Sequence, residues 1–283
     1  MHYDFKHIQA GDVSLAYVER GQGASLVLLH GSGPTDLRTW GQQIEPFAEH
    51  YRVIAYSRRY HYPNTWIDDD SAVLSTFVHA NDLAALIAAL QLGRVHLVGF
   101  SYGADIALRF AVEHPELLRT LVVGEPGLNS WLVTLPGGAS LFAESAGALQ
   151  AAKTEVQNGN FERSLQLFMD VVMGIGAFDQ IPPALYERLM ANVRLIGYEQ
   201  TEISESVTDI TQAEAATIRT PTLMLTGDKS PEAFWLVSQE LARWIPHAEQ
   251  AQITGASHLL HVMNPTDYNT AVLKFLAGHE TEG

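Results

Sequence analysis

The sequence predicts an α/β fold in which a mostly parallel central sheet is flanked by helices. Short continuous apolar runs, such as residues 25–29 and 95–98, have the length and composition of strands that are buried on both faces. Helical segments alternate with these runs along most of the chain, an order typical of parallel sheets. Residues 127–216 interrupt the alternation with helical segments and no clear buried strand, which predicts a helical cap.

The individual elements follow from changes of composition along the chain. Apolar, β-branched and aromatic runs are assigned to strands, Ala- and Leu-rich runs to helices, and Gly- or Pro-containing segments to turns. Before the cap, the predicted order is strands at 13–18 (antiparallel) and 25–29, a helix at 40–49, a strand at 51–56, a helix at 81–90, a strand at 95–98, a helix at 104–113 and a strand at 121–123. After it, the order is a strand at 222–226, a helix at 232–244, a strand at 248–253 and a helix at 266–276.

These elements define the expected domain organisation. The core is predicted to comprise residues 1–126 and 217–283, and the cap, residues 127–216, is inserted after the strand that ends near Gly124. A chain of 283 residues is long enough for one such core with a cap. Because ligands bind outside the carboxyl ends of the strands in open α/β sheets, we expect the cap to cover a ligand site there.

Composition excludes several classes of partner and chemistry. Hydrophobic residues make up 47% and charged residues 17% of the chain, as in globular proteins. The formal net charge of −15 repels phosphate backbones and anionic lipid, so nucleic acid and membrane are not expected as partners. The chain has no cysteine, which excludes disulfides, thiolate metal ligands and a catalytic thiol. A small-molecule substrate is the expected partner; a homo-oligomer is compatible with the sequence but not indicated by it.

Hydropathy along the chain predicts a location in the cytoplasm. Residues 1–7 are polar and lack the apolar run of a signal peptide. No stretch reaches the roughly 18 uncharged apolar residues of a transmembrane helix. The cytoplasm is therefore the default expectation.

A nucleophile is predicted at Ser101. Residues 99–103 read GFSYG and lie between a predicted strand and a predicted helix, which is the context that the pattern G-x-S-x-G requires. Small residues on both sides allow a sharp turn that exposes the serine hydroxyl above the sheet. The following helix also points its positive end at the negative charge that develops during acyl transfer.

An oxyanion hole is predicted from two backbone N–H groups. Residues 30–33 read HGSG and follow the strand at 25–29, so the N–H of Ser32 is one candidate donor. The residue after the nucleophile, Tyr102, is expected to supply the other. Both assignments concern the main chain, and neither uses a side-chain hydroxyl.

A serine hydroxyl needs a base, and position selects it from twelve histidines. His258 follows the last predicted strand and a loop of small residues, where the chain order of serine, acid and histidine places the base. The acid is left open by the residues alone. Glu125 follows the strand at 121–123 and Asp228 follows the strand at 222–226, and both loops lie at the same end of a parallel sheet.

Taken together, the segments HGSG (30–33), GFSYG (99–103) and GASH (255–258) resemble the α/β-hydrolase superfamily over nearly the whole chain. The resemblance implies that fold with a cap, a serine, histidine and acid triad, and no metal or cofactor. In many members the acid stands three residues after a glycine that follows the later strand; here that residue is Ser230, which is no carboxylate. In another group the acid directly follows the strand after the nucleophile helix. This resemblance favours Glu125, with Asp228 as the alternative.

The resemblance implies a serine hydrolase that acts through an acyl-enzyme intermediate. The many apolar residues of the cap favour a small, mostly apolar ester or lactone as the substrate. One alternative is a carbon–carbon hydrolase that acts on a ring-fission product, because HGSGP (30–34) is similar to the opening of such enzymes. Many of these have a tryptophan after the catalytic histidine, where this chain has Leu259. A ligand-binding receptor on the same fold is the other alternative.

Substrate contacts are predicted at two positions. Trp131 follows the Glu125 loop closely and is the best candidate for a pocket wall among the apolar residues of the cap. His61 lies in an unusual basic and aromatic cluster, RRYHY (58–62), and is a candidate for the pocket entrance. This cluster could contact an acidic or aromatic substrate, or pair with the acidic run at residues 68–70.

Overall fold

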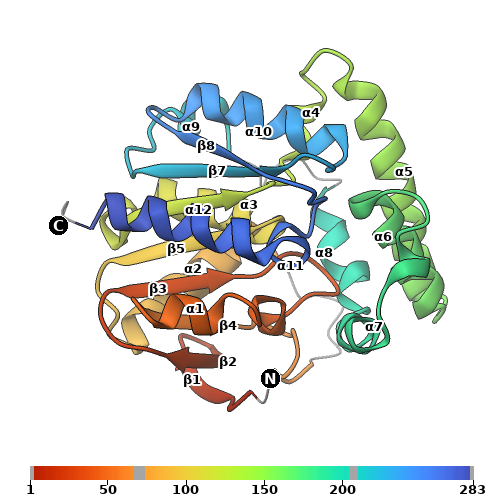
Figure 1. Cartoon of the computed structure of the whole chain (residues 1–283). Coiled ribbons are helices and arrows are strands. Elements are labelled where there is room, and N and C mark those ends of the chain that lie inside the picture. The colour runs from red at the N-terminus through yellow and green to blue at the C-terminus, as the bar shows by residue number, and fades with distance from the viewer. Residues whose placement is uncertain (1–2, 67–73, 204–209, 281–283) are drawn as a thin grey trace.

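The computed structural model describes residues 3–66, 74–203 and 210–280, which form one eight-stranded sheet with helices around it (Figure 1). The strand order is β1-β2-β4-β3-β5-β6-β7-β8. Every neighbouring pair from β4 to β8 is parallel, and β2 alone runs against the others. The α/β fold class predicted from the sequence is therefore confirmed. The strands are β1 (Lys6–Ala10), β2 (Val13–Arg20), β3 (Ser25–Leu29), β4 (Arg52–Tyr56), β5 (Val95–Phe100), β6 (Leu118–Gly124), β7 (Thr222–Gly227) and β8 (Glu249–Ile253).

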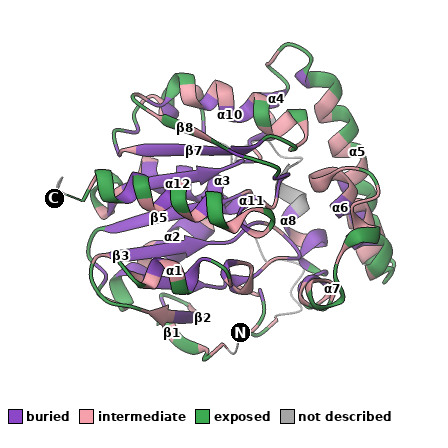
Figure 2. Cartoon of the chain, viewed as in Figure 1, coloured by how far each residue is buried: buried purple, intermediate pink, exposed green. Residues whose placement is uncertain are grey.

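Helices cover both faces of the sheet because the central strands are apolar on both faces. Successive residues of β3 alternate between two apolar cores: Leu26 and Leu28 join one, and Val27 and Leu29 join the other. Figure 2 shows the central strands buried while the outer faces of the helices are exposed. The helices and 3-10 turns of this core are η1 (Leu37–Trp40), α1 (Ile44–Ala48), α2 (Thr76–Ala89), α3 (Tyr102–Glu113), η2 (Pro115–Leu117), α10 (Glu232–Trp244), α11 (Leu260–Met263) and α12 (Pro265–Gly278).

Most of the helices between β6 and β7 lie beyond the carboxyl ends of the parallel strands, whereas the last of them (Gln212–Ala215) packs beside the sheet against α3 and α10 (Figure 1). They bury a third apolar cluster, which includes Leu165, Phe168 and Ile196. We keep the name cap for residues 127–216. None of the helices in the described part of the chain is long and apolar enough to cross a membrane. The cap elements are α4 (Asn129–Leu132), α5 (Gly138–Gln157), α6 (Phe161–Met173), η3 (Phe178–Gln180), α7 (Pro183–Met190), α8 (Leu195–Ile203) and α9 (Gln212–Ala215).

Several elements differ from the sequence-based expectation, and α2 begins at Thr76, five residues before the expected start. Strand β1 was not expected, because in this edge strand only Ala10 is buried and the apolar alternation that marks a strand is absent. The helix expected at 40–49 is divided into η1 and α1, which lie on either side of a turn at residues 41–43. Asp36 caps η1 by accepting a hydrogen bond from the N–H of Arg38, so this element begins earlier than expected.

The buried histidine of β5 predicts a loss of stability in mild acid. His96 is 1% exposed, its Nδ1 lies 2.9 Å from Thr120 Oγ1, and burial lowers its pKa to about 4. The folded protein therefore holds His96 neutral while the unfolded chain binds a proton below about pH 6.5, so stability falls as the pH drops from about 6.5 towards 4. Between pH 7 and pH 5, His96 should account for about 2 kcal/mol of the lost free energy of unfolding.

Urea unfolding of the wild type and His96→Gln at the two pH values checks this expectation. The variant should lose less stability between pH 7 and pH 5 than the wild type. His50→Gln, at an exposed position, is the matched control. Equal losses in the wild type and His96→Gln would contradict the assignment.

Candidate active site

Ser101 stands on a strained turn between β5 and α3. Its φ of 54° and ψ of −128° lie outside the regions that ordinary residues occupy, and such strain is typical of functional turns. The turn requires glycine at residue 103, since a Cβ there would collide with the carbonyl oxygen of His30. The Ser101 N–H donates to the carbonyl of Gly124 at 2.8 Å, which ties the turn to the end of β6. Ser101 itself remains partly exposed.

His258 and Glu125 complete a chain of hydrogen bonds that ends at Ser101. His258 Nε2 lies 2.9 Å from Ser101 Oγ, and His258 Nδ1 lies 2.8 Å from Glu125 Oε2. The second carboxylate oxygen, Glu125 Oε1, accepts a hydrogen bond of 2.7 Å from the N–H of Gly227. Glu125 and His258 are both buried. This arrangement fixes the imidazole with a proton on Nδ1 and a lone pair on Nε2 towards the serine.

Within the described residues, the other candidate acid makes no hydrogen bond to the histidine. Asp228 is exposed, and its N–H donates to the carbonyl of Ile253 at 3.3 Å. Glu125 holds its position because β6 and β7 are neighbours: the N–H of Glu125 donates to Leu225 of β7 at 3.2 Å. The neighbouring strand end thus supplies both the backbone anchor of Glu125 and the Gly227 N–H that binds its carboxylate.

The turn after β3 lies directly beside the nucleophile. A Cβ built on Gly31 would be 3.1 Å from the Cβ of Ser101, so the chain at residues 31–33 passes the serine at close range. Tyr102 begins α3, and its N–H stands at the positive end of the helix dipole. The two backbone donors predicted for the oxyanion, those of Ser32 and Tyr102, are therefore on elements that meet at Ser101.

Aromatic rings enclose the imidazole of His258. Phe234, on α10, stacks on it with a centroid separation of 3.8 Å and an interplanar angle of 14°, and Phe100 lies 4.9 Å away. Stacked aromatic faces favour a cation, so Phe234 is suited to the imidazolium that forms when the histidine takes a proton. Nothing in the local sequence marked Phe234, because this contact depends on how α10 packs above β7.

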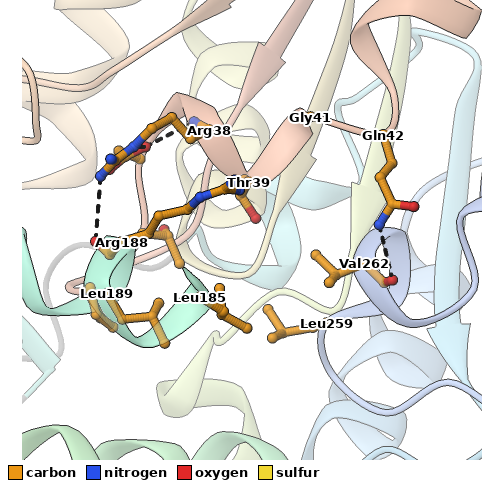
Figure 3. A pocket seen from close by; sticks show the side chains of 12 residues that line it. Arg38, Thr39, Gly41, Gln42, Leu185, Arg188, Leu189, Leu259 and Val262 are labelled. Carbon is orange, nitrogen blue, oxygen red and sulfur yellow. Dashed lines mark hydrogen bonds and ion pairs between the residues drawn. The ribbon is translucent and has the colours of Figure 1, made fainter. Parts of the chain in front are cut away.

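A small pocket lies between η1, α7 and the residue that follows His258, and neither Ser101 nor His258 lines it (Figure 3). Its volume is about 90 Å³, and its wall combines Leu185, Leu189, Leu259 and Val262 with the polar side chains of Arg38, Thr39, Gln42 and Arg188. Typical sites for drug-sized ligands occupy about 300–1,000 Å³. The space is therefore suited to a small group.

The two predicted substrate contacts are both buried inside the protein. Trp131 packs in the core and donates from Nε1 to the carbonyl of Ile210 at 2.6 Å. His61 is not at an entrance: its Nδ1 lies 2.7 Å from Thr35 O and its Nε2 lies 3.0 Å from Glu199 Oε1. These contacts occupy the polar atoms of both side chains.

The basic cluster at 58–62 is paired within the protein. Arg58 pairs with Glu199 of α8, and Arg59 pairs with Asp82 of α2. The acidic run at residues 68–70, the partner considered from the sequence, lies outside the described residues. The sequence marked Arg58 as unusual but not Glu199, which is 141 residues away along the chain.

Comparison with known proteins agrees with this geometry. A family model described as the alpha/beta hydrolase fold matches residues 25–265. The (E)-2-((N-methylformamido)methylene)succinate hydrolase of Acinetobacter baylyi is 28% identical over 262 residues, which are 92% of this chain and 93% of that protein. A 2-hydroxy-6-oxononadienedioate/2-hydroxy-6-oxononatrienedioate hydrolase of Paraburkholderia xenovorans is 32% identical over 168 residues, 56% of this chain and 54% of that protein.

Solved structures show the same architecture. The enol-lactonase from Burkholderia xenovorans has a TM-score of 0.74 with 19% identity, and the match covers 96% of this chain and 100% of that one. At this identity the likeness concerns the fold. The family match spans far more than half of the sequence, and the chain belongs to the α/β-hydrolase family.

Proposed function

We propose that this chain is a serine hydrolase that cleaves a small, mostly apolar ester or lactone through an acyl-enzyme intermediate. The observation that carries the proposal is the chain of hydrogen bonds from Glu125 through His258 to Ser101. The family indicates a hydrolase, and this geometry supports nucleophilic attack on a carbonyl carbon.

In the proposed reaction His258 Nε2 takes the proton of Ser101 Oγ as the oxygen attacks the carbonyl. Glu125 stabilises the imidazolium, and the N–H groups of Ser32 and Tyr102 bind the oxyanion. His258 then protonates the leaving alcohol. The same histidine activates water, which releases the acid and restores the serine. These steps use a small-molecule substrate and require no metal or cofactor.

Carbon–carbon cleavage of a ring-fission product is the second candidate. It is supported by the similarity to the Paraburkholderia xenovorans hydrolase, which is named for two dioate substrates. Arg188 in the wall of the small pocket offers a cation that would suit a carboxylate group of such a substrate.

A substrate panel separates the two candidates. We expect purified protein to hydrolyse short p-nitrophenyl esters and small aromatic lactones. The rate of product release should be proportional to the enzyme concentration. A carbon–carbon hydrolase would instead remove the visible absorbance of a ring-fission dioate and leave the esters almost untouched. Turnover of neither class, together with tight binding of one of these compounds, would overturn the proposal in favour of a receptor.

A further inference from the structure

The strongest feature outside the triad is a buried ion pair between the core and the cap. Arg58 lies two residues after β4, and Glu199 lies on α8. Arg58 Nη1 is 2.6 Å from Glu199 Oε1, and the two side chains are 0% and 2% exposed. Burial raises the pKa of Glu199, but the charges and hydrogen bonds of Arg58 and His61 together outweigh burial and hold that pKa below its usual range, so the carboxylate is ionised.

This pair binds the main chain on both sides of Ser32. Arg58 Nη2 donates to the carbonyl oxygen of Gly31 at 2.6 Å. Glu199 Oε2 accepts a hydrogen bond from the N–H of Gly33. One buried ion pair therefore holds the three-residue turn that carries the first predicted oxyanion donor.

The contact with Gly31 acts on the donor group itself. The carbonyl of Gly31 and the N–H of Ser32 belong to one planar trans peptide group, so they point in opposite directions. Arg58 holds the Gly31 oxygen together with His30 Nδ1, which lies 2.9 Å from the same oxygen, and these two contacts set the direction of the Ser32 N–H. A cation bonded to the carbonyl also polarises the peptide and strengthens its N–H as a donor.

Further contacts hold Arg58 at this place. His79 Nε2 lies 2.9 Å from Arg58 Nη1, and the ring of Tyr102, the second predicted donor, lies 5.1 Å from the guanidinium carbon. His61 contacts both Glu199 and Thr35, and the Thr35 N–H closes the turn by donating to Ser32 O at 3.2 Å. Removing a buried charge from this network leaves its partner uncompensated.

We propose that Arg58 and Glu199 are positioning residues of the oxyanion hole, and that the cap completes this hole through Glu199. The inference rests on the proposed function, because it presumes that Ser32 N–H binds an oxyanion. The inference gives α8 a second role. Besides covering the site, this helix positions an oxyanion donor through Glu199 and Arg58.

The test compares the wild type with Glu199→Gln and with the double variant Arg58→Met, Glu199→Leu. In the double variant both charges are replaced by apolar groups of similar size, a change that usually preserves a fold. The readouts are Tm, kcat and KM on a p-nitrophenyl ester, and the rate of labelling by a fluorophosphonate. In labelling, Ser101 Oγ forms a bond to phosphorus, fluoride leaves, and His258 takes the proton.

Glu214→Gln is the matched control, because the described contacts of the Glu214 carboxylate are with the buried Arg109 of α3 and with Thr211, and not with the oxyanion turn. We expect it to leave labelling unchanged. In both test variants we expect labelling and kcat to fall about 10- to 100-fold, less than the roughly 10²–10³-fold loss of a whole donor, with a small change in KM. The acidic limb of the pH profile should not move, because His258 and Glu125 are untouched.

Wild-type labelling and kcat in a folded double variant would overturn the inference, because the pair would then have a structural role alone. If the double variant does not fold, the labelling rate of Glu199→Gln decides in the same way. Failure of the wild type to label at Ser101 would instead overturn the proposed function, and the inference with it.

Discussion

Replacing Ser101 with alanine is expected to lower turnover of the best ester or lactone by about 10⁶-fold, as loss of the nucleophile does in other serine hydrolases. The reason is that His258 Nε2 would have no hydroxyl to activate, while the oxyanion donors would remain in place. A residual rate above that of water alone is expected from those donors. The loss is measured as kcat in steady-state kinetics, normalised to the concentration of folded enzyme.

Ser140→Ala serves as the control for this substitution. Ser140 is an exposed serine near the start of α5, and its hydroxyl donates within its own turn to Gly137 O at 2.8 Å. The control should turn over substrate like the wild type. Activity of Ser101→Ala close to that of the wild type would contradict the serine mechanism.

Replacing Glu125 with glutamine is expected to lower turnover by about 10⁴-fold while the fold is retained. A glutamine can still accept the hydrogen bond from Gly227 N–H, so the side chain should stay in position. Its amide, however, can donate to His258 Nδ1, which would place the imidazole proton on Nε2 and block its role as a base. The pH dependence of kcat/KM, measured beside Tm, separates this cause from unfolding.

Asp228→Asn is the matched comparison, because it makes the same chemical change at the other candidate acid. Asp228 is exposed and its described contact is made by its backbone, so the variant should keep most of its turnover. The reverse outcome, with Asp228→Asn inactive and Glu125→Gln active, would assign the role of the triad acid to Asp228, at the end of β7.

The sequence was most informative where function depends on short local patterns. Ser101 could be placed because the strand, the GFSYG turn and the helix are contiguous. His258 could be placed because it follows the last strand. The choice between Glu125 and Asp228 was harder, since both follow strands that end at the same edge of the sheet. That choice depends on whether the Glu125 side chain is long enough to contact His258 and on the hydrogen bond from the Gly227 N–H. Neither can be predicted from the local sequence.

Contacts between distant segments could not be predicted in this way. Phe234 reaches His258 through the packing of α10, and Glu199 reaches Arg58 across 141 residues from a helix of ordinary composition. His61 was expected near an entrance because it lies beside Tyr60 and Tyr62, yet it is buried and contacts Glu199 of α8. The local sequence around a residue does not predict which side chain from a distant segment will contact it.

The ion pair between Arg58 and Glu199 also constrains which caps can replace residues 127–216 of this protein. A cap grafted from a relative without an acidic residue in the place of Glu199 would leave Arg58 buried without a counter-charge, at a cost of about 3–5 kcal/mol. Chimeras and recombination libraries should therefore inherit positions 58 and 199 together. Substitutions aimed at a new substrate preference are then best made in the cap helices other than α8, which carries Glu199.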